Sequence, residues 1–263
     1  MSMFRPAILL AMTIGLLASN RSMNAVEITL YDAPAGTLPG TQPWLVYGEF
    51  GTVTQTLLGT TGTRLASDLG AQAGYSNTVP ILNTFKNPGF PSLDASQGFA
   101  IDWSMRLISE THSSPNRAGT SMILLGSDNM GIELGFWTDQ VWAQTSNPLF
   151  TKGESVNFDT TSASVDYRLQ VNGGNYVLNA NQAQILTGQT RSYAAFGSSP
   201  YTLSNYFFLG DNTTSAGATV DIGSVRLITP IPETSLTSLI IALAAGVVAL
   251  RRRQNAKRTA TKA

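Results

Sequence analysis

Apolar and polar residues alternate in several short segments of the chain. The clearest segment runs from Phe99 to Leu107, where large apolar side chains occupy every second position. Strict alternation predicts a β-strand with one buried face, because successive side chains of a strand point to opposite sides. The same pattern predicts strands over residues 132–136 and 167–171. Between the first two of these strands, 99–107 and 132–136, the uninterrupted apolar run Met122 to Leu125 predicts a strand that is covered on both faces.

Turn residues separate these segments. Asn172-Gly173-Gly174-Asn175 predicts a tight hairpin, because Asn and Gly tolerate the positive φ that such turns require. Two late strands are predicted over residues 206–209 and 219–227. In the second, the apolar phase shifts across Gly223-Ser224, which predicts a β-bulge. The best helical candidate, Arg64 to Ala73, is short and is interrupted by Gly70.

Short strands and frequent turns together predict an all-β fold, an antiparallel β-sandwich. We assign it to residues 26–229 as one domain. Its 8 basic and 15 acidic residues between Val26 and Pro230 give a net charge of −7. Such a domain has no basic patch for phosphates, so no nucleic-acid partner is expected. The chain contains no cysteine, which excludes disulfides and thiolate metal sites.

The first 25 residues are typical of a secretory signal peptide. Arg5 precedes an apolar run from Ala7 to Leu17, and Ala25 is a small residue at the expected cleavage position. The alternative is an uncleaved N-terminal anchor, which also places the domain outside the cytoplasm.

The other end of the chain has the layout of a membrane segment. An apolar run from Leu236 to Leu250 follows Pro232-Glu233-Thr234 and precedes Arg251, Arg252 and Arg253. At 1.5 Å per residue, the run predicts a short transmembrane helix of about 22 Å. The arginines should remain in the cytoplasm with the basic tail, residues 254–263, which leaves the domain outside.

Catalytic chemistry has few candidates. The only histidine, His112, lies in a polar segment that we expect to be a loop, and no serine has the glycine pattern of a nucleophile elbow. Sandwich glycosidases need two carboxylates, which can be placed two residues apart on one strand. Glu133 stands alone between Ile132 and Leu134, so we expect it to face outward and assign no catalytic residue.

Two oxygen-rich segments are candidates for calcium, Ser127-Asp128-Asn129 and the segment containing Asp211 and Asn212. Asp and Asn are also ordinary turn residues, so we expect turn chemistry at both segments, with a metal site as the alternative. The aromatic side chains Trp103, Phe136, Trp137 and Trp142 are candidates for stacking on sugars, but we expect them in the core. The candidate binding residues are therefore Asp128, Asn129, Glu133, Trp137, Asp211 and Asn212.

Several segments of the domain resemble the bacterial choice-of-anchor Y family. They are Leu30-Tyr31-Asp32-Ala33, Pro43-Trp44-Leu45, Phe90-Pro91-Ser92-Leu93-Asp94, Asn116-Arg117-Ala118-Gly119, Ser127 to Trp137, and Phe208 to Thr213. The resemblance covers about residues 28–228. It implies a jelly-roll sandwich like that of concanavalin or laminin-G domains, and it implies no established activity.

The C-terminal segment, residues 230–253, resembles a PEP-CTERM sorting signal, which exosortase processes in bacteria that make extracellular polysaccharide. Thr234 stands where the common form has a second proline. The resemblance implies that the membrane helix is a stage of delivery. We therefore expect a non-enzymatic surface or matrix protein, structural or associated with a polysaccharide; the alternative is a carbohydrate-active hydrolase on the same fold.

Overall fold

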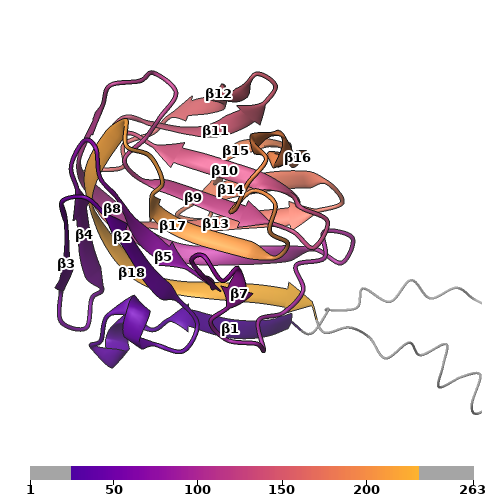
Figure 1. The fold of residues 1–263 in the computed structure, drawn as a ribbon, viewed down its shortest axis with the longest axis horizontal. Helices are drawn as coiled ribbons and strands as arrows, with labels where there is room; N and C mark the ends of the chain where they lie inside the picture. The colour runs from indigo at the N-terminus through magenta and orange to yellow at the C-terminus, as the bar shows by residue number, and fades with distance from the viewer. Residues whose placement is uncertain (1–24, 231–263) are drawn as a thin grey trace, which may run out of the picture.

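The computed structural model describes residues 25–230 of the chain. These residues form a β-sandwich of two antiparallel sheets (Figure 1). In spatial order, the first sheet, sheet A, contains β15 (Ala183–Gln189), β14 (Asn175–Ala180), β13 (Val165–Asn172), β8 (Phe99–His112), β18 (Ala216–Pro230), β4 (Thr63–Ser67) and β3 (Val53–Leu57). Strand β1 (Ala25–Tyr31) completes it by pairing with the C-terminal half of β18.

The second sheet, sheet B, lies against sheet A. Its order is β12 (Leu149–Asn157), β11 (Gln140–Ser146), β10 (Met130–Phe136), β9 (Ser121–Leu125), β17 (Tyr206–Asp211), β5 (Gln72–Ser76) and β2 (Val46–Phe50), and β16 (Arg191–Ser192) pairs with β10. The remaining elements are short: β6 (Thr78–Val79), β7 (Thr84–Phe85), and the 3-10 helices η1 (Ala33–Ala35), η2 (Pro39–Thr41) and η3 (Ala194–Phe196).

The predicted strands are confirmed. Buried and exposed residues alternate strictly along β13, all five residues of β9 are buried, and the turn at Gly173-Gly174 joins β13 to β14 with both glycines at positive φ. The bulge is also present, because the pairing of β18 with β8 shifts register between Ile222 and Val225. The helical candidate over residues 64–73 is wrong. That segment forms most of β4 and the start of β5, joined by a turn that contains Gly70.

The core lies between the two sheets. Trp103 of β8 stacks on Tyr167 of β13 with ring centroids 5.2 Å apart, and both rings meet the edge of Phe136 from sheet B. Trp142 is also fully buried. The prediction of core positions is therefore confirmed for Trp103 and Phe136. Trp142 is buried but lies outside this core, and the prediction is wrong for Trp137, which is only half-buried.

The two ends of the described chain meet at one end of the sandwich. Ala25 pairs with Pro230 at the beginning of β1 and the end of β18 (Figure 1). We call this end the terminal pole. At the other end of the same strand, Ala216 pairs with His112, and we call this end the distal pole. Within residues 25–230, no helix has the length and apolarity needed to cross a bilayer.

Candidate functional site

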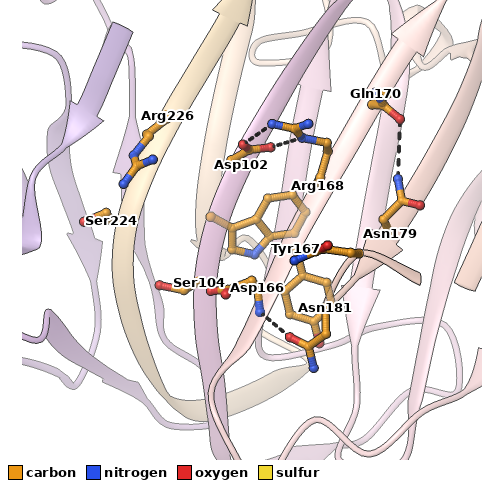
Figure 2. A pocket seen from close by; sticks show the side chains of 12 residues that line it. Asp102, Ser104, Asp166, Tyr167, Arg168, Gln170, Asn179, Asn181, Ser224 and Arg226 are labelled. Atoms are coloured by element: carbon orange, nitrogen blue, oxygen red, sulfur yellow. Dashed lines mark hydrogen bonds and ion pairs between the residues drawn. The ribbon is translucent and has the colours of Figure 1, made fainter. Parts of the chain in front are cut away.

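An open polar groove lies on the outer face of sheet A, with a volume of about 780 Å³. Strands β8, β13, β14 and β18 supply most of its walls, because every second residue of each strand points outward, and the turn after β14 adds Asn181 and Gln182. The outward side chains are mostly amides, carboxylates and guanidinium groups: Asp102, Ser104, Asp166, Arg168, Gln170, Asn179, Asn181, Gln182, Ser224 and Arg226. Figure 2 shows these side chains arranged over an extended area.

The charges of this groove are largely paired within the protein. Arg168 donates to both carboxylate oxygens of Asp102, and each bond is 2.6 Å long (Figure 2). Arg226 lies 3.7 Å from Glu27 of β1. Asn179 and Gln170 are weakly engaged, since Asn179 Nδ2 is 3.4 Å from Gln170 Oε1, whereas Asn181 Oδ1 accepts from the backbone N–H of Asp166 (3.0 Å). The groove therefore presents hydrogen-bonding groups, and its positive and negative side chains balance each other.

A second polar cluster is buried on the outer face of sheet B, around Glu133 of β10. The Tyr201 hydroxyl donates to Glu133 Oε2 (2.5 Å), and Asn212 Nδ2 donates to Glu133 Oε1 (2.9 Å). The Tyr193 hydroxyl accepts from the backbone N–H of Glu133 and donates to the carbonyl of Gln144. Strands β10 and β11 thus hold the segment from Tyr193 to Tyr201 against the sheet, through backbone groups at Tyr193 and through the buried Glu133 carboxyl group at Tyr201.

Glu133 faces outward from the core, as expected, but it does not reach solvent. Its side chain does leave the face opposite the main core, but only 1% of the residue is exposed because Tyr193 and Tyr201 cover it. Burial raises the pKa of Glu133, while the hydrogen bonds from Tyr201 and Asn212 and the charge of Arg117 oppose the rise. The sequence could not show this cover, since Tyr201 is 68 residues away.

Asp211 and Asn212 point to opposite sides of sheet B, although they are neighbours in the sequence. Asn212 reaches Glu133, whereas Asp211 points inward and accepts a hydrogen bond of 2.5 Å from Ser67 of sheet A. The backbone N–H of Thr213 donates to the other oxygen of Asp211. Burial raises the pKa of Asp211 to about 7. Asp211 therefore links the two sheets.

Asp128 and Asn129 form the turn between β9 and β10. Asp128 Oδ1 accepts from the backbone N–H of Met130 (3.0 Å), Asn129 has a φ of 61°, and Ser204 donates to Asn129 Oδ1. Asp128 and Asn129 therefore stabilise a turn, and Ser204 binds this turn to the segment before β17. Across residues 25–230, no three His, Asp or Glu side chains gather in a group that could hold a metal ion.

Trp137 follows β10 and is engaged by two side chains near the distal pole. The His112 ring stacks on it at 4.1 Å, and Lys152 Nζ lies 3.7 Å from the ring centroid. A sugar that stacks on Trp137 must therefore compete with both. His112 ends strand β8, so the expectation that it lies in a loop is wrong; its Nδ1 contacts both oxygens of Glu110, whose pKa is raised by burial.

The predicted site residues are thus dispersed. The structure joins Glu133 to Asn212, keeps Asp128 and Asn129 together in one turn, and places Trp137 and Asp211 in two other settings. The predicted sorting residues Pro232, Glu233, Thr234, Arg251, Arg252 and Arg253 lie outside the described residues.

The groove on sheet A was missed from the sequence. Its strands were predicted, and Asp102, Arg168 and Gln170 are the polar members of the alternating pattern. The missing information was the pairing of β8 with β13, which brings Asp102 opposite Arg168.

Neither a family model nor a curated protein sequence matches the chain. Solved structures with a remote similarity include the Ca²⁺-bound exoplasmic/lumenal domain of VIP36, at 10% identity and a TM-score of 0.47, over 79% of this chain and 92% of that chain. Another is the apo Crh5 transglycosylase, at 14% identity and a TM-score of 0.47, over 78% and 85%. A carbohydrate esterase from the Shiga toxin-encoding bacteriophage phi24B has 10% identity and a TM-score of 0.46, over 70% and 90%. Similarity at this level does not identify a ligand or an activity for this chain.

Proposed function

We propose that this chain is an exported bacterial surface or matrix protein whose β-sandwich binds a polysaccharide without cleaving it. The observation that supports this function is the groove on sheet A. An open groove fits a polymer better than it fits a small molecule that must be enclosed. Its Asn, Gln, Asp and Arg side chains suit hydroxyl groups, which both donate and accept hydrogen bonds. Because three of its four charged side chains are paired within the protein, all but Asp166, we expect a neutral glycan.

Binding can be tested by affinity electrophoresis in gels that contain neutral or acidic polysaccharides. We expect a neutral polysaccharide to retard the protein, and the double variant Gln170→Ala/Asn179→Ala to lose most of the retardation. Gln97→Ala is the matched control, since Gln97 is exposed outside the groove. No retardation by any polysaccharide, or equal retardation of the double variant, would contradict the assignment of the groove.

The export part of the proposal rests on the terminal segments. The signal peptide over residues 1–25 and the PEP-CTERM-like segment over residues 230–253 suit a protein that is exported, held by a membrane helix over about residues 236–250, and processed by exosortase. The cell surface or the extracellular matrix is then the final location. Fractionation of the producing cells tests this step, and intact protein in the cytosol would exclude it.

A carbohydrate-active hydrolase is the second candidate, and one observation favours it. Asp166 lies two residues before Arg168, the cross-strand partner of Asp102, so two carboxylates share the groove as diagonal neighbours. However, both oxygens of Asp102 accept hydrogen bonds from Arg168, which leaves this carboxylate poorly placed to donate a proton. Release of reducing ends from a bound polysaccharide, lost in Asp166→Asn, would establish the hydrolase.

A further inference from the structure

The edge strands of the two sheets differ in how they are protected from pairing with another chain. Charged side chains protect sheet B, because β2 carries Glu49 and β12 carries Lys152 and Glu154. At one edge of sheet A, β15 approaches β12 of the facing sheet. Strand β3, at the other edge, has no such protection. It carries no charge or proline, and no charged residue occurs from position 50 to position 63.

The free backbone groups of β3 can be located from its hairpin with β4. The Leu58 N–H donates to the Gly62 carbonyl (2.9 Å), so Leu58 and Gly62 form a hydrogen-bonded pair. Hydrogen-bonded and non-hydrogen-bonded pairs alternate along an antiparallel ladder. It follows that the N–H and C=O groups of Val53, Gln55 and Leu57 point away from β4. Among the described strands, only β4 pairs with β3, which lies at the rim of the molecule (Figure 1).

The sequence of β3, Val-Thr-Gln-Thr-Leu, is nearly symmetric about Gln55. When two copies align antiparallel with Gln55 opposite Gln55, each Thr54 faces a Thr56 and each Val53 faces a Leu57. Thr–Thr and apolar pairs of this kind stabilise adjacent strands. In this register, the outward backbone groups of Val53, Gln55 and Leu57 all meet groups of the other copy.

From these observations we propose that β3 pairs with β3 of a second copy of this chain across a two-fold axis at Gln55. The pair joins two copies of sheet A into one continuous sheet. A two-fold contact of this type needs one self-complementary segment, which β3 supplies. The self-association is independent of glycan binding, since the polar groove lies over β8, β13, β14 and β18.

Disulfide cross-linking of the full-length protein tests this register. The chain has no cysteine, so Thr54→Cys and Thr56→Cys each introduce a single thiol. We expect a mixture of the two variants to form a covalent dimer on mild oxidation, because residues 54 and 56 face each other across the axis. Each variant alone should cross-link poorly, since diagonal neighbours are too far apart for a disulfide. No dimer in the mixture, or equal dimer in a single variant, would overturn the proposal.

Sedimentation velocity of the full-length protein gives a second, non-covalent test. The double variant Thr54→Lys/Thr56→Lys places lysines opposite lysines, so we expect the dimer dissociation constant to rise at least about tenfold. Gln184→Lys on β15 is the control. It should leave the dimer dissociation constant unchanged, because Gln184 is exposed on the opposite edge of sheet A. A protein that remains monomeric at all concentrations, or a dimer that the double lysine variant does not weaken, would refute β3 pairing.

Discussion

Asp211 makes the stability of the domain depend on pH. Its pKa is about 7 in the folded protein, above the ordinary value of 3.8, because burial disfavours the carboxylate. The folded state therefore holds a proton that the unfolded state releases between about pH 4 and pH 7. By linkage, Asp211 contributes its full stabilisation below about pH 4, and this is lost as the pH rises through 7.

The variant Asp211→Asn should reduce this pH dependence. An amide keeps an acceptor for Ser67 or Thr213 and has no proton to release. We expect the fall in unfolding free energy between pH 4 and pH 7 to shrink by as much as about 1.4 kcal/mol per pH unit. Burial also raises the pKa values of Glu110 and Glu133, so some slope should remain. Urea unfolding at several pH values measures how the unfolding free energy changes with pH. The same pH dependence in Asp211→Asn and in the natural protein would contradict the role of Asp211.

The hydroxyl of Tyr201 stabilises the cover over sheet B. In Tyr201→Phe, Glu133 loses a hydrogen bond at a fully buried oxygen, so we expect a loss of about 1–3 kcal/mol in unfolding free energy. Tyr31→Phe is the matched control: Tyr31 is also buried, and its hydroxyl has no hydrogen-bond partner within residues 25–230. Similar losses in urea unfolding of both variants would show that the hydroxyl contact to Glu133 is unimportant.

Single residues were the hardest feature to predict from the sequence. Glu133 and Asn212 were both named as candidates, yet nothing in either segment indicated their contact, because it depends on how β10 and β17 are placed in sheet B. Tyr201 was not named at all. A buried polar cluster arises from segments that are distant in the sequence, and the alternation within one strand does not report it.

At the scale of elements, the hairpin between β13 and β14 offers a simple test. Gly174 has a φ of 83°, and a Cβ atom there would meet no other atom within 4 Å. Gly174→Ala should therefore lower the unfolding free energy by about 1 kcal/mol through backbone strain alone. Chemical denaturation measures the change. An alanine variant as stable as the natural protein would show that the turn readily adopts another conformation.

Elements with local signals were predicted well. Alternation identified β8 and β13, the Asn-Gly turn identified their hairpin neighbour β14, and a phase shift identified the bulge in β18. The segment over residues 64–73 was mistaken for a helical candidate because β4 and β5 are short and join different sheets. Their assignment to separate sheets depends on tertiary contacts, which a short window of sequence does not contain.

At the scale of the whole molecule, processing should remove both terminal segments. If the signal peptide is cleaved after Ala25 and the sorting signal is processed, the mature protein begins at Val26 and lacks the apolar run from Leu236 to Leu250. Intact-mass spectrometry of protein from the producing bacterium measures both ends together. Recovery of the whole 28.0 kDa chain would contradict both predictions.

The pairing of Ala25 with Pro230 at the terminal pole fixes the direction in which the domain projects from any attachment. A chain held by its C-terminal segment is held at that pole, and the distal pole with His112 faces away. Pairing through β3 reverses one copy relative to the other, so the terminal poles of the two copies point in opposite directions. Such a pair is poorly suited to two anchors in one flat membrane. It is suited to spanning the gap between facing cell surfaces, or to linking molecules that have already been released.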